Sequence, residues 1–125
     1  MAKKLVADDD ATFISLMSDY LGQHYRVLTA FNGHEMAQLA AQEKPALIIL
    51  DISMPETSGA SAYQLLRWDP GTSSIPVIFV SSHPRNKVKP PIPSEPHTRY
   101  FQKPIDFAEL TQAIKELLSV RTENP

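Results

Sequence analysis

The sequence predicts an α/β domain in which helices cover both faces of a five-stranded parallel sheet, a doubly wound fold. Five short apolar runs alternate with stretches whose apolar residues recur at helical spacing, and this alternation is typical of parallel sheets with crossover helices. Acidic residues directly follow the first and third apolar runs, where such sheets place their ligands. The 125 residues, 42% of them hydrophobic, suffice for one domain of this kind.

The first strand and helix are predicted within the first 22 residues. Lys4–Ala7 is a short run that favours a strand, and Ala11–Leu21 has apolar residues at helical spacing. Gly22 follows and favours the end of that helix. The face expected to point inward carries Phe13, Leu16, Met17, Tyr20 and Leu21.

A second strand and helix follow at once. Tyr25–Ala30 favours a strand, and Asn32–Gly33 favours a turn. His34–Glu43 is predicted to be helical, and Pro45 marks its end because the residue before a proline avoids helical geometry. The inward face of this helix would carry Met36, Leu39 and Ala40.

The middle of the chain predicts the central strand and a third helix. Ala46–Leu50 is a continuous aliphatic run, which is typical of a strand buried on both faces. Ser58–Trp68 is expected to be helical, with Tyr63 and Leu66 facing inward. Trp68 is expected to pack at the end of this helix.

Two more strands and a last helix complete the alternation. Val77–Val80 and Tyr100–Gln102 are the remaining strand candidates. Asp106–Ser119 is predicted to be helical, and Asp106 with Glu109 resembles a capping box. We expect the domain to span residues 1–120 and residues 121–125 to form a flexible tail or the start of a linker.

Segment 84–96 interrupts the pattern where a fourth helix is due. Five of its thirteen residues are proline, and each proline inside a helix costs about 3 kcal/mol. We therefore expect an extended or polyproline-like loop with at most one helical turn. This loop is either a tolerated surface loop or an altered docking surface.

Composition excludes several classes of function. The net charge of −2 gives no electrostatic reason to expect nucleic-acid binding, and the absence of cysteine excludes disulfides, thiol catalysis and zinc–thiolate sites. No apolar run approaches the roughly 18 residues of a membrane span, so we expect a cytoplasmic protein without membrane contact. The histidines lack metal-ligand spacing, and those expected to be ordinary surface residues are His24, His34 and His97.

Acidic side chains predict a metal site at the carboxyl edge of the sheet. Asp8, Asp9 and Asp10 follow the first strand, and Asp51 follows the third. Carboxylates packed so closely repel one another, and a divalent cation relieves this repulsion. Because the ligands are oxygen atoms only, Mg²⁺ fits better than a soft metal.

Two further residues stand at the ends of predicted strands. Ser81 follows Val77–Val80, and Lys103 follows Tyr100–Gln102. A hydroxyl, an ammonium and a metal around one carboxylate are what an aspartyl phosphate needs, because the cations offset the charge of the phosphoryl oxygens. The arrangement therefore favours phosphoryl transfer to Asp51.

Four pieces of the chain match one known family, in order and each at a predicted strand end. They are Leu-Val-Ala-Asp-Asp-Asp at 5–10, Asp-Ile-Ser-Met-Pro-Glu-Thr-Ser-Gly at 51–59, Phe-Val-Ser-Ser at 79–82 and Tyr-Phe-Gln-Lys-Pro at 100–104. On these pieces the chain resembles the response-regulator receiver domains of two-component signalling along essentially its whole length. The resemblance implies a flavodoxin-like (βα)5 fold with strand order 2-1-3-4-5, here with its fourth helix replaced or shortened.

The resemblance also implies a role for each acidic residue. Asp51 would be the phosphoacceptor. Asp8 and Asp9 would be the acidic pair that binds Mg²⁺, with Asp9 the more direct ligand, and the backbone carbonyl of Ser53 would be a further ligand. Asp10 lies just past this pair and is expected to cap the first helix instead.

Outside the metal site, the resemblance implies four more roles. Ser81 would engage the phosphoryl group and Lys103 would neutralise it. Tyr100 would be the aromatic switch residue that turns inward as Ser81 moves, although plain core packing would also explain it. Ser53 and His83 would tune the lifetime of the phosphorylated state.

The predicted function is a phosphoacceptor switch rather than an enzyme, with self-catalysed phosphotransfer and dephosphorylation only. The donor would be a histidine kinase or histidine phosphotransfer protein, and an unknown downstream protein or output domain would read the switch. One alternative is a pseudo-receiver that binds proteins without phosphorylation. A second is a Mg²⁺-dependent aspartyl phosphohydrolase, but Ser53 stands where that class usually carries a second acid.

Overall fold

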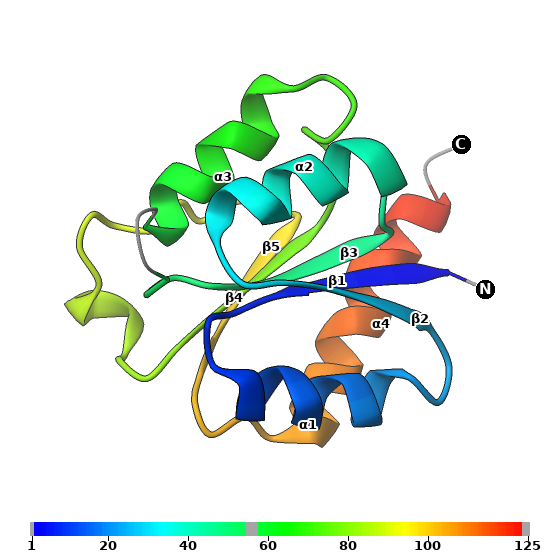
Figure 1. The fold of residues 1–125 in the computed structure, drawn as a ribbon, viewed down its shortest axis with the longest axis horizontal. Coiled ribbons are helices and arrows are strands. Elements are labelled where there is room, and N and C mark those ends of the chain that lie inside the picture. Colours follow the sequence, from blue (N-terminus) through cyan, green and yellow to red (C-terminus); the bar gives the residue numbers. More distant parts are fainter. Residues whose placement is uncertain (1, 55–57, 124–125) are drawn as a thin grey trace.

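The computed structural model describes residues 2–54 and 58–123, and for 120–123 it describes the backbone alone. Two layers of helices enclose one sheet, as Figure 1 shows. The strands are all parallel in the order β2-β1-β3-β4-β5, which confirms the predicted doubly wound fold. They are β1 Lys3–Ala7, β2 Arg26–Ala30, β3 Leu47–Asp51, β4 Val77–Ser81 and β5 Thr98–Gln102. The helices are α1 Ala11–Leu21, α2 Gly33–Glu43, α3 Gly59–Trp68 and α4 Phe107–Glu123, with a 3₁₀ turn at Arg85–Lys87.

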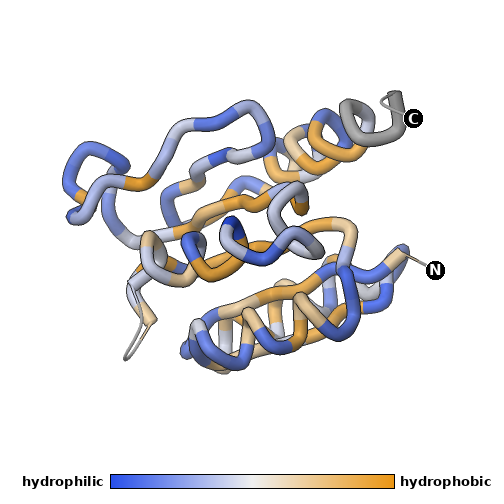
Figure 2. Tube along the Cα trace, turned by 90° about the horizontal axis from the view of Figure 1, so that it is seen from above, coloured by the Kyte–Doolittle hydropathy of each residue, from blue (hydrophilic) through white to orange (hydrophobic). Residues whose placement is uncertain are grey.

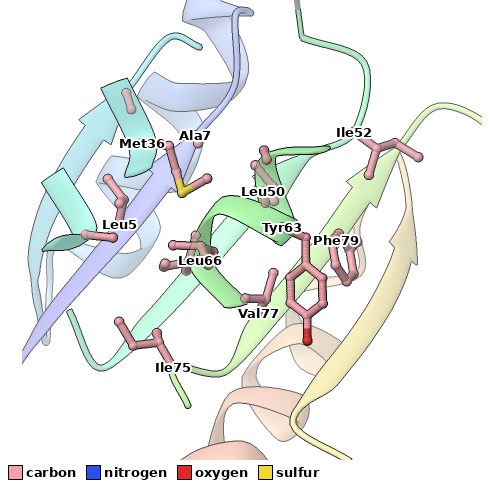
Figure 3. Packing of buried hydrophobic residues seen from close by; sticks show 14 of the residues in the cluster. Leu5, Ala7, Met36, Leu50, Ile52, Tyr63, Leu66, Ile75, Val77 and Phe79 are labelled. Atoms are coloured by element: carbon pink, nitrogen blue, oxygen red, sulfur yellow. The ribbon is translucent and has the colours of Figure 1, made fainter. Parts of the chain in front are cut away.

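Helices α2 and α3 cover one face of the sheet. Met36 from α2 and Tyr63 and Leu66 from α3 point toward Leu5 and Phe79 of the strands (Figure 3). Helices α1 and α4 cover the other face in the same way, so hydrophobic residues follow the strands through the middle of the molecule (Figure 2). None of the helices in the described part of the chain is long and apolar enough to span a bilayer.

Two apolar side chains that were predicted to be packed are exposed instead: Leu16, expected on the inward face of the first helix, and Trp68, expected to pack at the end of the third. The buried stripe of α1 centres on Phe13, Met17 and Leu21, and Leu16 lies beside this stripe with half of its surface exposed. Trp68 is 73% exposed. It follows the buried Leu66 by two residues, which places it on nearly the opposite side of the helix. Both predictions were wrong because helical spacing alone does not fix the width of a buried face.

The last helix is longer than predicted. It continues to Glu123 rather than ending at Ser119, since no glycine or proline interrupts residues 120–124. Residues 124–125 of the predicted tail lie outside the described residues. The predicted end of the domain at residue 120 therefore falls inside α4.

Residues 84–96, here called the proline segment, form no α-helix. The segment contains the 3₁₀ turn and continues without regular structure to β5 (Figure 1). The side chain of Ile92 is buried, and the Arg85 guanidinium donates to the carbonyls of Ile92 and Pro93 at 3.3 and 3.0 Å. This confirms that a loop replaces the helix expected between β4 and β5. The buried Ile92 side chain and the Arg85 hydrogen bonds hold this loop in place.

His97, predicted to be a surface residue, is instead half-buried directly before β5. Its Nε2 lies 2.8 Å from the Tyr63 hydroxyl of α3, and burial lowers the pKa of its imidazole. The surface prediction was wrong because α3 packs over this position, and α3 is distant from it in sequence.

Candidate functional site

The predicted acidic residues meet at the carboxyl edge of the sheet, on the left of Figure 1. Asp8 follows β1 and Asp51 ends β3; the two strands are neighbours and pair Ala7 with Leu50. The carboxylate oxygens of Asp8, Asp9 and Asp51 lie within 4.8 Å of one another. Asp8 and Asp51 are buried, whereas Asp9 is exposed, so the cluster opens to solvent on the side of Asp9.

Asp51 carries an electrostatic penalty in this position. Burial and, next, the negative charge of Asp8 raise the pKa of Asp51 to about 6, although Lys103 and the Ser53 amide act in the opposite direction. The protein's own groups thus compensate the carboxylates only in part. A hard divalent cation with oxygen ligands would supply the missing positive charge.

Lys103 reaches the cluster from the turn after β5. Its Nζ donates to Asp8 Oδ2 at 2.7 Å and lies 4.1 Å from the centroid of the Phe13 ring. Its backbone amide donates to the carbonyl of Ser81 at 2.6 Å. Lys103 is therefore in the predicted site, but its direct partner is Asp8 rather than Asp51.

Ser81 is fully buried at the end of β4, next to β3. Asp51 of β3 pairs with Val80 of β4, and Ser81 is the next residue of β4 after Val80. Its Oγ accepts a hydrogen bond from the His83 amide at 3.0 Å. This bond orients the hydroxyl and ties it to the start of the loop that leads into the proline segment.

Tyr100 and His83 are connected through the backbone. The Tyr100 hydroxyl donates to the carbonyl of His83 at 2.5 Å, and the Arg85 guanidinium lies 5.6 Å from the centroid of its ring. The His83 side chain itself is exposed. The sequence indicated His83 for its side chain, whereas the contacts described here are made by its amide and carbonyl.

Ser53 and Asp10 hold the edges of the cluster. The Ser53 amide donates to Asp51 Oδ1 at 3.2 Å, while its side chain is exposed. Asp10 caps α1 as predicted, because its Oδ1 accepts from the amides of Thr12 and Phe13 at 2.9 and 3.4 Å. Its own amide donates to Asp8 Oδ1 at 2.9 Å, so the acid that caps the helix also orients Asp8.

Phe13 is the residue of this site that the sequence analysis missed. It was assigned to the core only, and it is indeed 9% exposed, but its ring also lies against the ammonium of Lys103. The available signal was an aromatic residue in the first turn of a helix that begins directly after the acids.

Known proteins resemble this chain over nearly its whole length. The model of the response regulator receiver domain family matches residues 5–115. This chain belongs to that family. Protein PilH of Pseudomonas aeruginosa is 35% identical to the receiver domain described here, over 95% of this chain and 99% of PilH.

Solved structures confirm the fold of this receiver domain. A response regulator receiver domain protein from Clostridium thermocellum has a TM-score of 0.81 at 23% identity, with 98% of each chain covered. The chemotaxis response regulator CheY4 of Vibrio cholerae has a TM-score of 0.80 at 23% identity. The match covers 94% of this chain and 99% of the CheY4 chain. At these identities the likeness concerns the fold alone.

Proposed function

We propose that this receiver domain accepts a phosphoryl group on Asp51 in a Mg²⁺-dependent reaction and thereby switches a protein-binding surface. The observation that carries the proposal is the meeting of Asp8, Asp9 and Asp51 beside the ammonium of Lys103. Membership in the receiver family supports it.

The acidic cluster fits Mg²⁺ by its chemistry. Three carboxylates within 4.8 Å provide oxygen ligands only, and their combined charge exceeds that of Lys103, which contacts Asp8. Asp8, Asp9 and Asp51 would hold the ion, together with the backbone carbonyl of Ser53. The bound ion would supply positive charge to the carboxylates and to the phosphoryl oxygens.

The protein's own residues would perform the transfer. A carboxylate oxygen of Asp51 forms a bond to phosphorus while the phosphorus–nitrogen bond of a donor phosphohistidine breaks, and the electron pair returns to the imidazole nitrogen. Lys103 lies close enough to Asp8 to neutralise negative charge at the same edge. The buried Ser81 hydroxyl would donate a hydrogen bond to a phosphoryl oxygen.

The donor would be a histidine kinase or a histidine phosphotransfer protein in the cytoplasm. The signal would leave the site through Ser81, since its hydroxyl accepts from the His83 amide and the His83 carbonyl accepts from Tyr100. A change at Ser81 would thus reach Tyr100 and the proline segment, with Ser53 and His83 setting the lifetime of the phosphorylated state.

The test combines mass spectrometry with NMR. Incubation with Mg²⁺ and acetyl phosphate should add the mass of one phosphoryl group, and Asp51→Asn should remain unmodified. Beryllofluoride, which mimics the aspartyl phosphoryl group, should shift the amides of Ser81, Tyr100 and the proline segment in the presence of Mg²⁺ only. A folded protein that responds to neither reagent would be a pseudo-receiver, and continuous release of phosphate from small phosphoesters would indicate a phosphohydrolase.

A further inference from the structure

Arg85 connects the proline segment to Tyr100 of β5. It begins the 3₁₀ turn and is half-buried. Its guanidinium lies 5.6 Å from the centroid of the Tyr100 ring, within the range of a cation–π contact. Its Nη2 also donates to the carbonyls of Ile92 and Pro93 at 3.3 and 3.0 Å. A single side chain thus contacts both the ring of Tyr100 and the far part of the segment.

Within residues 2–54 and 58–123, few other hydrogen bonds hold the middle of the proline segment. Backbone bonds close the 3₁₀ turn at its start, and at its end the Glu95 amide donates to the Thr98 hydroxyl at 3.0 Å. Between these ends, the donor that the described part of the chain offers to the carbonyls of Ile92 and Pro93 is Arg85. Proline has no amide hydrogen, so the prolines nearby cannot replace it. The segment therefore depends on Arg85 and on the buried Ile92 side chain.

Tyr100 also contacts the residues that lead into the segment. Its hydroxyl donates to the carbonyl of His83 at 2.5 Å, and the His83 amide donates to Ser81 Oγ at 3.0 Å. A planar guanidinium stacks on a ring while its N–H groups, which lie in the plane, donate to carbonyls beside it. If the Tyr100 ring left this position, its contacts with His83 and with Arg85 would be lost together.

We propose that Arg85 couples the proline segment to Tyr100, so that the position of the Tyr100 ring decides whether the segment is held against the domain or released. The inference deepens the proposed function by naming the residue through which the switch reaches the segment. It rests on that function only for control by the phosphoryl group, because the contacts of Arg85 are present without phosphate.

Trypsin cleavage after Lys87 measures release of the segment. Lys87 is exposed in the 3₁₀ turn, and a protease needs the chain around the cleaved bond to open locally. At low trypsin concentration the initial rate follows the population of the open form. Mass spectrometry of the fragments identifies the bond between Lys87 and Val88 and separates it from other cleavage sites.

Loss of either partner of the cation–π contact should release the segment. Arg85→Met should speed cleavage after Lys87 about fivefold, and Tyr100→Leu at least as much, since each removes a contact that holds the turn. The double variant should be cut within about twofold of the Tyr100→Leu rate, because both residues act through one contact. Arg85→Lys should not restore the wild-type rate, since an ammonium lacks the planar set of donors.

Arg99 of β5 provides the matched control. It is half-buried, and it also donates to backbone carbonyls, those of Pro96 and Thr98 at 3.1 and 2.8 Å. It pairs with Glu116 of α4, whereas Tyr100 packs against the core cluster on the other face of the sheet. Arg99→Met should therefore leave the cleavage rate within about twofold of wild type. Circular dichroism of each variant establishes that it is folded.

Beryllofluoride with Mg²⁺ tests control by the phosphoryl group. It should change the cleavage rate of the wild type at least about threefold and that of Arg85→Met less than about 1.5-fold, because the coupling is lost. Asp51→Asn should lose the response to beryllofluoride but keep the full effect of Arg85→Met.

Three results would overturn the coupling. They are a wild-type cleavage rate in Arg85→Met, full rescue by Arg85→Lys, and effects of Arg85→Met and Tyr100→Leu that multiply in the double variant. Phosphorylation of Asp51 that leaves the rate unchanged would overturn control of the segment by the switch. An Asp51 that accepts no phosphoryl group would overturn the proposed function alone, so the two failures are distinguished.

Discussion

Two lysines at opposite edges of the sheet both lie against an aromatic ring, but within residues 2–54 and 58–123 only one of them has an acidic partner. At the carboxyl edge, Lys103 Nζ lies 2.7 Å from Asp8 Oδ2 and 4.1 Å from the centroid of the Phe13 ring. Near the amino edge, Lys4 of β1 is fully buried with its Nζ 3.6 Å from the centroid of the Tyr25 ring. Among the described residues, Lys4 Nζ finds no hydrogen-bond acceptor.

The difference shows what a buried ammonium needs. Burial lowers the pKa of Lys4 to about 8, because a ring face replaces only part of the lost hydration. Lys103 is less buried and offsets the charge of a fully buried carboxylate. We therefore expect Lys103 to support both stability and chemistry, and Lys4 to reduce stability without a part in the chemistry.

The largest expected effect separates the two lysines by function. Lys103→Met should slow phosphorylation by acetyl phosphate about a hundredfold, because one source of positive charge at the acidic cluster is lost. Lys4→Met should leave the rate within about twofold, since Lys4 lies at the far edge of the sheet. Intact mass spectrometry over time measures both rates, and equal slowing in the two variants would contradict the comparison.

The same two variants should change stability in opposite directions at pH 7. Lys103→Met should lower the free energy of unfolding by about 2–3 kcal/mol, because it leaves Asp8 buried without its partner. Lys4→Met should raise it by about 2 kcal/mol, since the apolar chain length is kept and a buried charge is removed. Urea unfolding in EDTA measures both changes; a destabilised Lys4→Met protein would show that the ring compensates the ammonium fully.

The gain from Lys4→Met should depend on pH in a defined window. The pKa of Lys4 is about 8 in the folded state and about 10.4 when unfolded, so folding carries the full cost of the charge below pH 8. As pH rises from 8 to 10, the folded protein releases this proton first and the cost is lost. The advantage of Lys4→Met should therefore shrink to below about 1 kcal/mol at pH 10, and an advantage independent of pH would argue for packing instead.

The smallest expected effect compares the two rings. Tyr25→Leu should destabilise the protein by about 1 kcal/mol more in the wild-type background than in Lys4→Met, because the ring is the contact that Lys4 retains. Phe13→Leu should show a coupling to Lys103 of about 0.5 kcal/mol or less, since Asp8 still holds the ammonium. Double-mutant cycles in urea measure both couplings, and a larger coupling at Phe13 would reverse the ranking.

The fold and the acidic cluster could be predicted because they depend on local patterns. Apolar runs of strand length and helical spacing predicted each element to within a few residues. The prolines of segment 84–96 excluded a helix between β4 and β5, because proline lacks the amide hydrogen that a helix interior needs. Asp8 and Asp51 directly follow or end neighbouring strands, and the carboxyl ends of parallel strands share an edge. Their proximity therefore follows from the fold itself.

The sequence by itself thus determined the strands, the helices and their layers, and its resemblance to receiver domains supplied the strand order, which puts the acids at one edge. The tertiary structure decided which partner each side chain finds: Phe13 for Lys103, Tyr63 for His97, and the Tyr25 ring for Lys4. Phe13 and Lys103 are far apart in the sequence, and so are Tyr63 and His97. Lys4 stands in β1, whose neighbours β2 and β3 come from later parts of the chain. The spacing of residues along the sequence decides which side chains share one face of a helix or strand. Burial and charge pairing depend instead on the distances between elements, and these distances are set only when the helices pack on the sheet.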